Sequence, residues 1–169
     1  MPSGGTQSYH FNGFNTLKIL DNKLCRPFDA TRAGLNLGEG AGYVVLESEL
    51  SVNRRRAEII CELTGYGNAC DAFHQTATSE NGEGPYLAMQ KAIKMADLKP
   101  SDIDYVNAHG TGTPNNDLTE SVALKRVFGD DSVPDFSSTK AFTGHTTSGA
   151  GGVEAVISAM CLVNDFLPK

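Results

Sequence analysis

Hydrophobic residues in the first third of the chain recur at two different spacings. Four of them lie three residues apart: Phe11, Phe14, Leu17 and Leu20. This spacing places them on one face of a helix and predicts a short amphipathic helix over residues 9–20. Residues 43–47 (YVVLE) instead form a continuous β-rich run after the glycine-dense segment 38–42, which predicts tight backbone packing followed by a buried strand.

From residue 57 onward the pattern alternates between strands and helices. The predicted elements are a strand at 57–66, a helix at 85–96, a strand that leads to His109, a helix from Asn116 or Asp117 to Phe128, a strand at 133–136 and a helix at 153–163. Gly129 is expected to end the middle helix. The last helix is apolar on almost every side, which predicts that it is buried. The alternation predicts an α/β fold in which helices pack on a parallel or mixed sheet.

Charge and cysteine usage narrow the possible partners. The net charge is −6 over 169 residues, and the basic run at residues 54–56 is interpreted as a solvated surface. Nucleic acid and anionic membrane are therefore not expected as partners, because binding phosphates depends on clustered Lys and Arg. The four cysteines are scattered without metal-ligand spacing, and no signal peptide or apolar segment of membrane length is recognised. We expect a reducing cytoplasm and no metal site.

Two histidines follow predicted strands in similar loops rich in Gly and Thr. His109 comes directly after the apolar run at 104–108, and His145 follows the strand at 133–136 by way of the segment 137–144 (SSTKAFTG). Catalytic loops of α/β folds lie at the carboxyl ends of strands. The sequence therefore predicts that the two histidines share one site.

Four ordered motifs give the chain a specific resemblance. They are residues 25–29 (CRPFD), residues 34–42 (GLNLGEGAG), residues 107–117 (NAHGTGTPNND) and residues 138–145 (STKAFTGH). In this order they resemble the β-ketoacyl-acyl-carrier-protein synthases of the condensing-enzyme family. The resemblance implies a thiolase-like α/β fold of two pseudo-repeated halves. Residues 1–50 would then be the tail of the first half, and residues 51–169 most of the second half, truncated before its final strands.

The resemblance also implies a reaction, in which a Cys-His-His site extends an acyl chain by two carbons from malonyl-acyl carrier protein. His109 and His145 are the expected donors to the thioester oxygen, each neutral, because two imidazole N–H groups can stabilise the enolate that decarboxylation forms. Lys140 is expected to hold glutamate and histidine groups in place. A buried ammonium needs a partner. Candidates are Asp117, Glu120 and Glu154, of which Glu120 matches the family position best; Asp117 and Glu120 alternatively serve only the first turn of a helix.

Other expectations concern the substrate. Thr111 and Thr113 either donate hydrogen bonds to the phosphopantetheine arm or bond local backbone. That arm arrives on the carrier protein, so no resident cofactor is expected; the partners are acyl carrier protein, malonyl and acyl thioesters, and a second copy of the chain or a missing N-terminal half. Asn107 and Glu154 match positions where relatives can hold a monovalent cation, but no metal is predicted.

The departures from the family pattern leave three interpretations open. The family nucleophile lies in a Thr-Ala-Cys-Ser motif at a helix start, and Cys25, Cys61, Cys70 and Cys161 all lack that setting. Thr146 and Thr147 stand where relatives usually have two apolar residues. The chain is then a fragment of a ketoacyl synthase that is inactive alone, one subunit of a split enzyme, or a non-catalytic module that forms dimers or binds partners.

Overall fold

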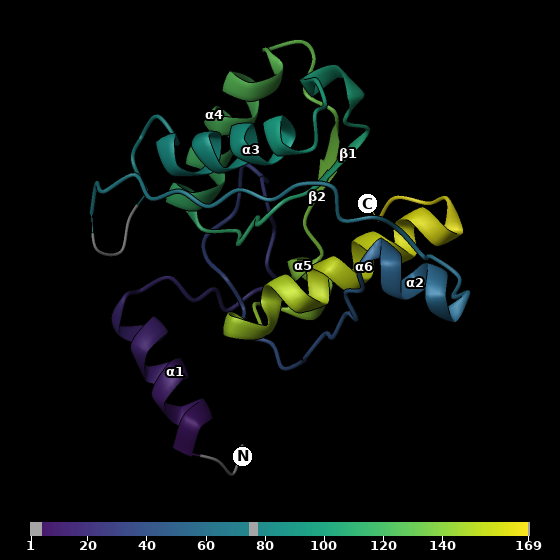
Figure 1. The fold of residues 1–169 in the computed structure, drawn as a ribbon. Coiled ribbons are helices and arrows are strands. Elements are labelled where there is room, and N and C mark those ends of the chain that lie inside the picture. The colour runs from purple at the N-terminus through teal and green to yellow at the C-terminus, as the bar shows by residue number, and fades with distance from the viewer. Residues whose placement is uncertain (1–4, 75–77, 169) are drawn as a thin grey trace.

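The computed structural model describes residues 5–74 and 78–168, which form six α-helices, two short 3₁₀ helices and two strands within these ranges. Figure 1 shows how these elements are arranged. In chain order they are α1 (Gly5–Thr16), α2 (Glu49–Arg55), α3 (Glu83–Met95), η1 (Pro100–Asp102), β1 (Tyr105–Asn107), α4 (Pro114–Phe128), β2 (Asp135–Ser137), α5 (Lys140–Thr143), η2 (Thr147–Gly149) and α6 (Ala150–Asn164).

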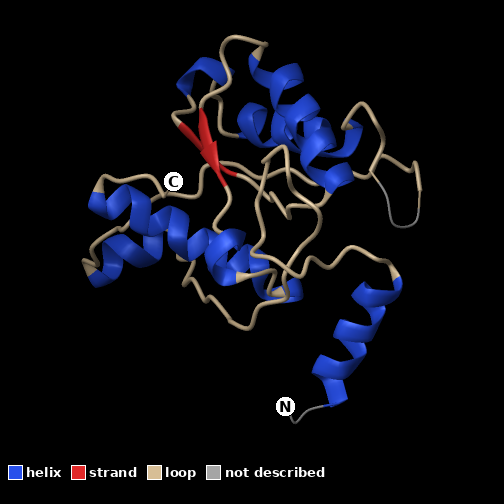
Figure 2. Cartoon of the chain, turned by 180° about the vertical axis from the view of Figure 1, so that it is seen from behind, coloured by secondary structure: helices blue, strands red, loops and turns tan. Residues whose placement is uncertain are grey.

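The two strands form a small parallel sheet between two groups of helices. Val106 pairs with Phe136, so the carboxyl ends of β1 and β2 lie side by side. Helices α3 and α4 pack against each other on one side, and α2 and α6 lie together on the other, in both views (Figures 1 and 2). Helix α1 projects away from the rest of the chain. The parallel pairing of strands joined by a helix confirms the α/β architecture.

Most predicted helices form, with shifted ends. Helix α1 begins and ends about four residues earlier than the predicted range of 9–20. Helix α4 begins at Pro114 with Thr113 as its N-cap, rather than at Asn116 or Asp117. Proline suits the first helical position because the N–H of that residue has no acceptor within the helix, so nothing is lost when it is missing. Gly129 ends α4 with φ +90°, as expected from glycine's freedom at positive φ.

The two strands predicted at 43–47 and 57–66 are wrong for the described chain. Both segments lack regular strand pairing, and Tyr43 and Val45 are each 89% exposed. A strand requires a hydrogen-bonded neighbour, and no described segment lies beside them in that way. Glycines in or directly before these segments contact helices instead. Gly42 lies against the first turn of α6, and Gly65 against α3 so closely that a Cβ on either would meet backbone atoms.

The prediction that the last helix is buried is also wrong. Helix α6 has only Ala150 and Cys161 fully buried, and Leu162 is 70% exposed. No described segment covers the apolar side chains on the outer side of this helix. We define the exposed apolar segments as residues 43–46, 59–63 and 160–163, in which every apolar side chain except that of Cys161 is exposed. No described helix is long and apolar enough to span a bilayer.

The most buried part of the chain surrounds the two histidine loops. Cys25, Leu35, Ala108, Ala123 and Leu124 form its apolar component. The largest fully buried side chains are Lys140 at the start of α5 and three side chains of α4, Leu124, Thr119 and Asp117. Lys140 and Asp117 belong to the predicted site. Charged groups are rarely buried unless they are paired. The core of this chain is thus built around its candidate site.

Candidate active site

Adjacent strand ends bring the two histidines together. After β1 ends at Asn107, the Ala108 N–H donates to Ser137 O at 2.9 Å, which keeps the two chains side by side as they leave the sheet. His109 follows immediately, and His145 follows the short helix α5. Their ring centroids lie 5.2 Å apart with an interplanar angle of 87°. The prediction that the two histidines lie close together is confirmed.

The segment at residues 36–38 holds the His145 loop from the other side. The His145 N–H donates to Asn36 O at 2.7 Å, and the Gly38 N–H donates to His145 O at 3.1 Å. A Cβ at Gly38 would collide with Thr143 O, so only glycine permits this approach. The glycine-dense segment therefore has the packing role that the sequence predicts.

The hydrogen bond at His145 Nδ1 determines which tautomer this imidazole adopts. The Thr147 N–H donates to Nδ1 at 3.0 Å, so in the neutral ring the proton lies on Nε2. Desolvation, followed by the charge of Lys140, lowers the pKa of His145. The Phe14 ring on α1 lies 6.3 Å from the His145 ring. His145 is thus a neutral donor through Nε2.

His109 is held through its backbone. Glu120 accepts hydrogen bonds from the His109 N–H at 2.7 Å and from the Gly110 N–H at 2.9 Å, while Lys140 Nζ donates to His109 O at 2.6 Å. Although His109 is open to solvent on one side, desolvation by the surrounding protein lowers its pKa to about 4, and the charge of Lys140 adds to this. His109 is therefore neutral at pH 7. Burial raises the pKa of Glu120.

The partner of Lys140 differs from the one that the resemblance favours. Its ammonium forms an ion pair with Glu154 on α6, not with Glu120. Glu120 is occupied by the two N–H groups of the His109 loop. Glu154 instead lies on the first turns of α6, opposite the start of α5. The pair neutralises a lysine that would otherwise be costly to bury.

Asp117 and the two threonines hold the loop between His109 and α4. Asp117, 1% exposed, accepts from the Phe28 N–H at 2.7 Å and the Gly112 N–H at 3.2 Å. It also lies in the first turn of α4, where a carboxylate suits the helix dipole. The hydroxyls of Thr111 and Thr113 are buried and lie 2.8 Å apart, within hydrogen-bond distance of each other. These are local bonds, and contact with a substrate stays a prediction.

None of the four cysteines has the environment of a nucleophile. Cys61 and Cys70 are exposed, and Cys161 is buried on α6. Cys25 is the one whose thiol reaches the His109 loop, where it donates to Thr111 O at 3.1 Å. Burial, and then the Asp117 carboxylate, raise the pKa of that thiol, which disfavours the reactive thiolate.

Asn107 occupies the position at which the resemblance suggests a cation. Its Nδ2 donates to Ser158 Oγ at 3.1 Å and Glu154 O at 3.3 Å, while its buried Oδ1 has no hydrogen-bond partner. One unpaired amide oxygen is too few ligands to define a metal site. Across residues 5–74 and 78–168, no three His, Cys, Asp or Glu residues are grouped to hold a metal ion.

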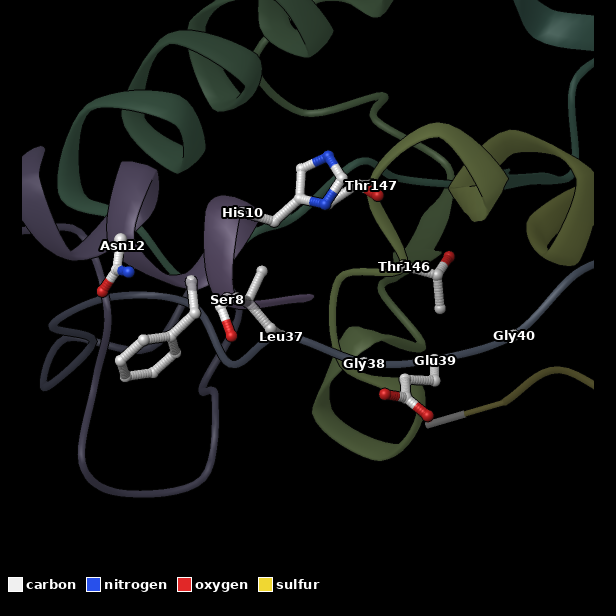
Figure 3. Close-up of a pocket in the computed structure, with 10 residues that line it drawn as sticks. Ser8, His10, Asn12, Leu37, Gly38, Glu39, Gly40, Thr146 and Thr147 are labelled. Atoms are coloured by element: carbon white, nitrogen blue, oxygen red, sulfur yellow. The ribbon is translucent and has the colours of Figure 1, made fainter. Parts of the chain in front are cut away.

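A cavity of about 480 Å³ borders the His145 loop. Figure 3 shows His10 of α1 extending toward Thr147, with Thr146 and the segment 38–40 nearby. The lining residues are Ser8, His10, Phe11, Asn12, Leu37, Gly38, Glu39, Gly40, Thr146 and Thr147. Thr146 and Thr147, where the sequence departs from the family pattern, thus line the cavity next to His145.

Some positions that shape the site were not recognised from the sequence. The Thr147 N–H sets the His145 tautomer through the backbone, which leaves no signal in the residue type. Ser138 Oγ donates to Gly110 O at 2.8 Å and links the two histidine loops. Its place between β2 and Lys140 is a signal that could have indicated this role. Phe14 fits the helical spacing of α1, which does not reveal contact with a histidine.

Comparison with known proteins places this chain in one family. A family model described as "Beta-ketoacyl synthase, C-terminal domain" matches residues 60–169. The 3-oxoacyl-[acyl-carrier-protein] synthase 2 of Rhizobium meliloti is 46% identical over 180 residues, covering 99% of this chain and 42% of that protein. The mitochondrial 3-oxoacyl-[acyl-carrier-protein] synthase of Arabidopsis thaliana is 41% identical, covering 99% of this chain and 40% of that protein.

Solved structures agree with this relationship. The ishigamide ketosynthase/chain length factor superposes with a TM-score of 0.90 at 38% identity, covering 95% of this chain and 39% of the other. A β-ketoacyl synthase from Burkholderia phymatum gives a TM-score of 0.83 at 32% identity, covering 97% of this chain and 40% of the other. The chain spans about two fifths of the length of these relatives. It has the thiolase-like ketosynthase fold in part, and it belongs to the β-ketoacyl synthase family.

Proposed function

We propose that this chain supplies the decarboxylating part of a 3-oxoacyl-[acyl-carrier-protein] synthase. The observation that carries the proposal is the pair of neutral imidazoles at His109 and His145, 5.2 Å apart between ring centroids. Two N–H donors that converge on one oxygen can stabilise a thioester enolate. The neutral state of both rings follows from their lowered pKa values.

In the proposed reaction, a malonyl thioester places its carbonyl oxygen between the two rings. The bond to the terminal carboxylate breaks, CO₂ leaves, and the electron pair enters the enolate, whose oxygen accepts hydrogen bonds from both histidines. The enolate carbon then attacks the carbonyl carbon of an acyl thioester, and a carbon–carbon bond forms. The bond between that carbonyl carbon and the cysteine sulfur breaks, and the sulfur leaves as a thiolate that takes up a proton. Lys140 and Glu154 keep the His109 backbone in place through the contact between Nζ and His109 O.

The acyl group must be held on a cysteine that this chain does not provide in a suitable setting. Its substrates would be malonyl and acyl thioesters delivered by acyl carrier protein, with the phosphopantetheine arm as part of the substrate and no resident cofactor. A related type II polyketide ketosynthase has been solved in complex with its acyl-carrier protein, which supports this choice of partner. Thr111 and Thr113, two residues from each other in the His109 loop, are the proposed contacts for the arm.

The exposed apolar segments support the proposal that another polypeptide segment completes the site. Exposed apolar surface favours association, and the non-helical segments 43–46 and 59–63 can also pair with a strand of another segment. That segment would bring the nucleophilic cysteine, either within one longer chain or on a separate subunit of a split enzyme, and the assembly would include a second copy or a paired chain. A purely structural module is disfavoured, because it has no use for a buried lysine and glutamate aligned behind a histidine pair.

We further propose that the protein works in the cytoplasm. All four cysteines are free, including the exposed Cys61 and Cys70, as suits a reducing compartment.

A chimera tests the proposed function. This chain replaces the matching 42% of the Rhizobium meliloti synthase, which keeps its own remaining segments. We expect the chimera to extend an acyl-carrier-protein-bound acyl group by two carbons, and this chain alone to be inactive. A folded chimera that neither condenses nor decarboxylates malonyl-acyl carrier protein would overturn the proposal, as would condensation by this chain alone.

A further inference from the structure

Three contacts join the turn at residues 25–29 to the loop that carries His109. The Phe28 ring packs on Gly110, where a Cβ would lie 2.8 Å from Phe28 Cε2. The Cys25 thiol donates to Thr111 O at 3.1 Å. Asp117 bridges the same two segments by accepting from the N–H groups of Phe28 and Gly112. The loop is therefore held along its length by a segment that is distant in sequence.

Cys25 is closely enclosed at this junction. It is 3% exposed, and its N–H donates to Asn36 Oδ1 at 2.6 Å. A Cβ added to Gly112, which has φ +74°, would lie 2.7 Å from the Cys25 sulfur. Gly112 and the sulfur thus fit against each other with no space for another carbon atom. Because burial raises the pKa of the thiol, Cys25 stays protonated and can keep donating.

The loop depends on such contacts because its own backbone is permissive. Gly110 and Gly112 both have positive φ, at +42° and +74°, and glycine restricts the backbone less than any other residue. His109 directly precedes this pair. The orientation of its ring toward His145 therefore depends on what holds residues 110–113.

We propose that Cys25 is a positioning residue for His109: its buried thiol fixes Thr111 and, with Asp117, holds the loop so that His109 faces His145. The consequence of this positioning for catalysis rests on the function proposed above. The positioning itself can be measured without any activity, so the failure of one proposal is distinguishable from the failure of the other.

The experiment measures hydrogen exchange of this chain by mass spectrometry at micromolar concentration. Exchange at the imidazole C2 position of His109 as a function of pH gives its pKa, expected at about 4 in the unmodified chain. In Cys25→Ala the loosened loop admits water, so we expect this pKa to rise by about half a unit or more. Amide exchange in residues 110–113 is expected to accelerate about tenfold. Cys25→Ser keeps a donor and is expected to restore most of both values.

Cys161→Ala is the matched control, because it removes a thiol of similar burial from α6. It is expected to leave the His109 titration and the exchange of residues 110–113 unchanged. The proposal is overturned if Cys25→Ala leaves both quantities at their original values, or if Cys161→Ala changes them equally. Should Cys25→Ala fail to fold, Cys25→Val, which fills similar space but has no donor, is compared with Cys161→Val. An effect on residues 110–113 in the first variant alone supports the proposal, and equal effects overturn it.

Discussion

The imidazole rings of His109 and His145 face each other nearly at right angles, with 5.2 Å between their centroids. Each ring comes from a loop at the carboxyl end of one of two paired parallel strands. Desolvation is the first cause of the lowered pKa of both rings, and the Lys140 charge the second. The same lysine that holds the His109 backbone thus helps to keep both rings neutral.

The stability of the chain is expected to depend on pH through His109. Its pKa is about 4 when folded and 6.5 as the unperturbed reference. As the pH falls below 6.5 the unfolded state takes up the proton first, so the stability that neutral His109 contributes is present above 6.5 and lost as the pH falls toward 4. Denaturant unfolding of the chain and of His109→Gln checks this.

The difference in unfolding free energy between these two proteins is expected to change by about 1 kcal/mol or more from pH 7 to pH 4.5, after allowance for solvent screening. Glu120, whose raised pKa acts in the opposite direction, is present in both proteins and largely cancels. Parallel pH profiles for the two proteins would contradict the lowered pKa of His109.

The His145 tautomer is a second prediction. Because the Thr147 N–H donates to Nδ1, the proton of the neutral ring lies on Nε2. Nitrogen-15 NMR of the imidazole at pH 7.5 distinguishes the tautomers by the shifts of the two ring nitrogens. A predominant Nδ1–H form would show that this hydrogen bond is not made and that His145 presents an acceptor to the site.

The ion pair between Lys140 and Glu154 predicts a large effect of removing one partner. In Glu154→Gln the lysine, 2% exposed, loses its counter-charge, and we expect a loss of roughly 3 kcal/mol of unfolding free energy. Glu49→Gln on the first turn of α2 is the control, expected to change stability by about 0.5 kcal/mol or less, since Glu49 is exposed. Equal effects of the two substitutions would argue against the ion pair.

Self-association of the isolated chain is also expected. The exposed apolar segments at 43–46, 59–63 and 160–163 leave large side chains in water. Sedimentation velocity over a hundredfold concentration range is expected to show growing assemblies, and Val45→Lys with Leu162→Lys is expected to reduce them. Val52→Lys on α2 is a comparison outside these segments. A monodisperse monomer at all concentrations would contradict this expectation.

The sequence predicted the elements that carry the site better than those that surround it. Strands β1 and β2 and helices α3 and α4 have strong local signals, such as Gly129 at the end of α4, although the start of α4 was predicted at Asn116 or Asp117 and lies at Pro114. The strands expected at 43–47 and 57–66 did not form, because strand formation depends on a neighbour that local pattern does not reveal. The prediction that α6 is buried was wrong for a similar reason, because burial also depends on a neighbouring segment that the local pattern does not reveal.

Within the site, residue types predicted proximity but not pairing. The meeting of His109 and His145 followed from strand ends and was confirmed. The choice of Glu154 over Glu120 as the partner of Lys140 depended on how α6 crosses α5, which is a tertiary relationship. Backbone donors such as the Thr147 N–H leave no trace in side-chain identity.

Malonyl decarboxylation by the Rhizobium meliloti chimera tests the central claim most directly. CO₂ release from malonyl-acyl carrier protein is measured for the chimera and for its His109→Ala and His145→Ala variants, with His74→Ala, in the loop before α3, as the control. Each site variant is expected to lose about 100- to 1,000-fold in rate, as removal of one oxyanion donor typically does, while the control retains the rate. Unchanged decarboxylation in folded His109→Ala and His145→Ala variants would contradict the account.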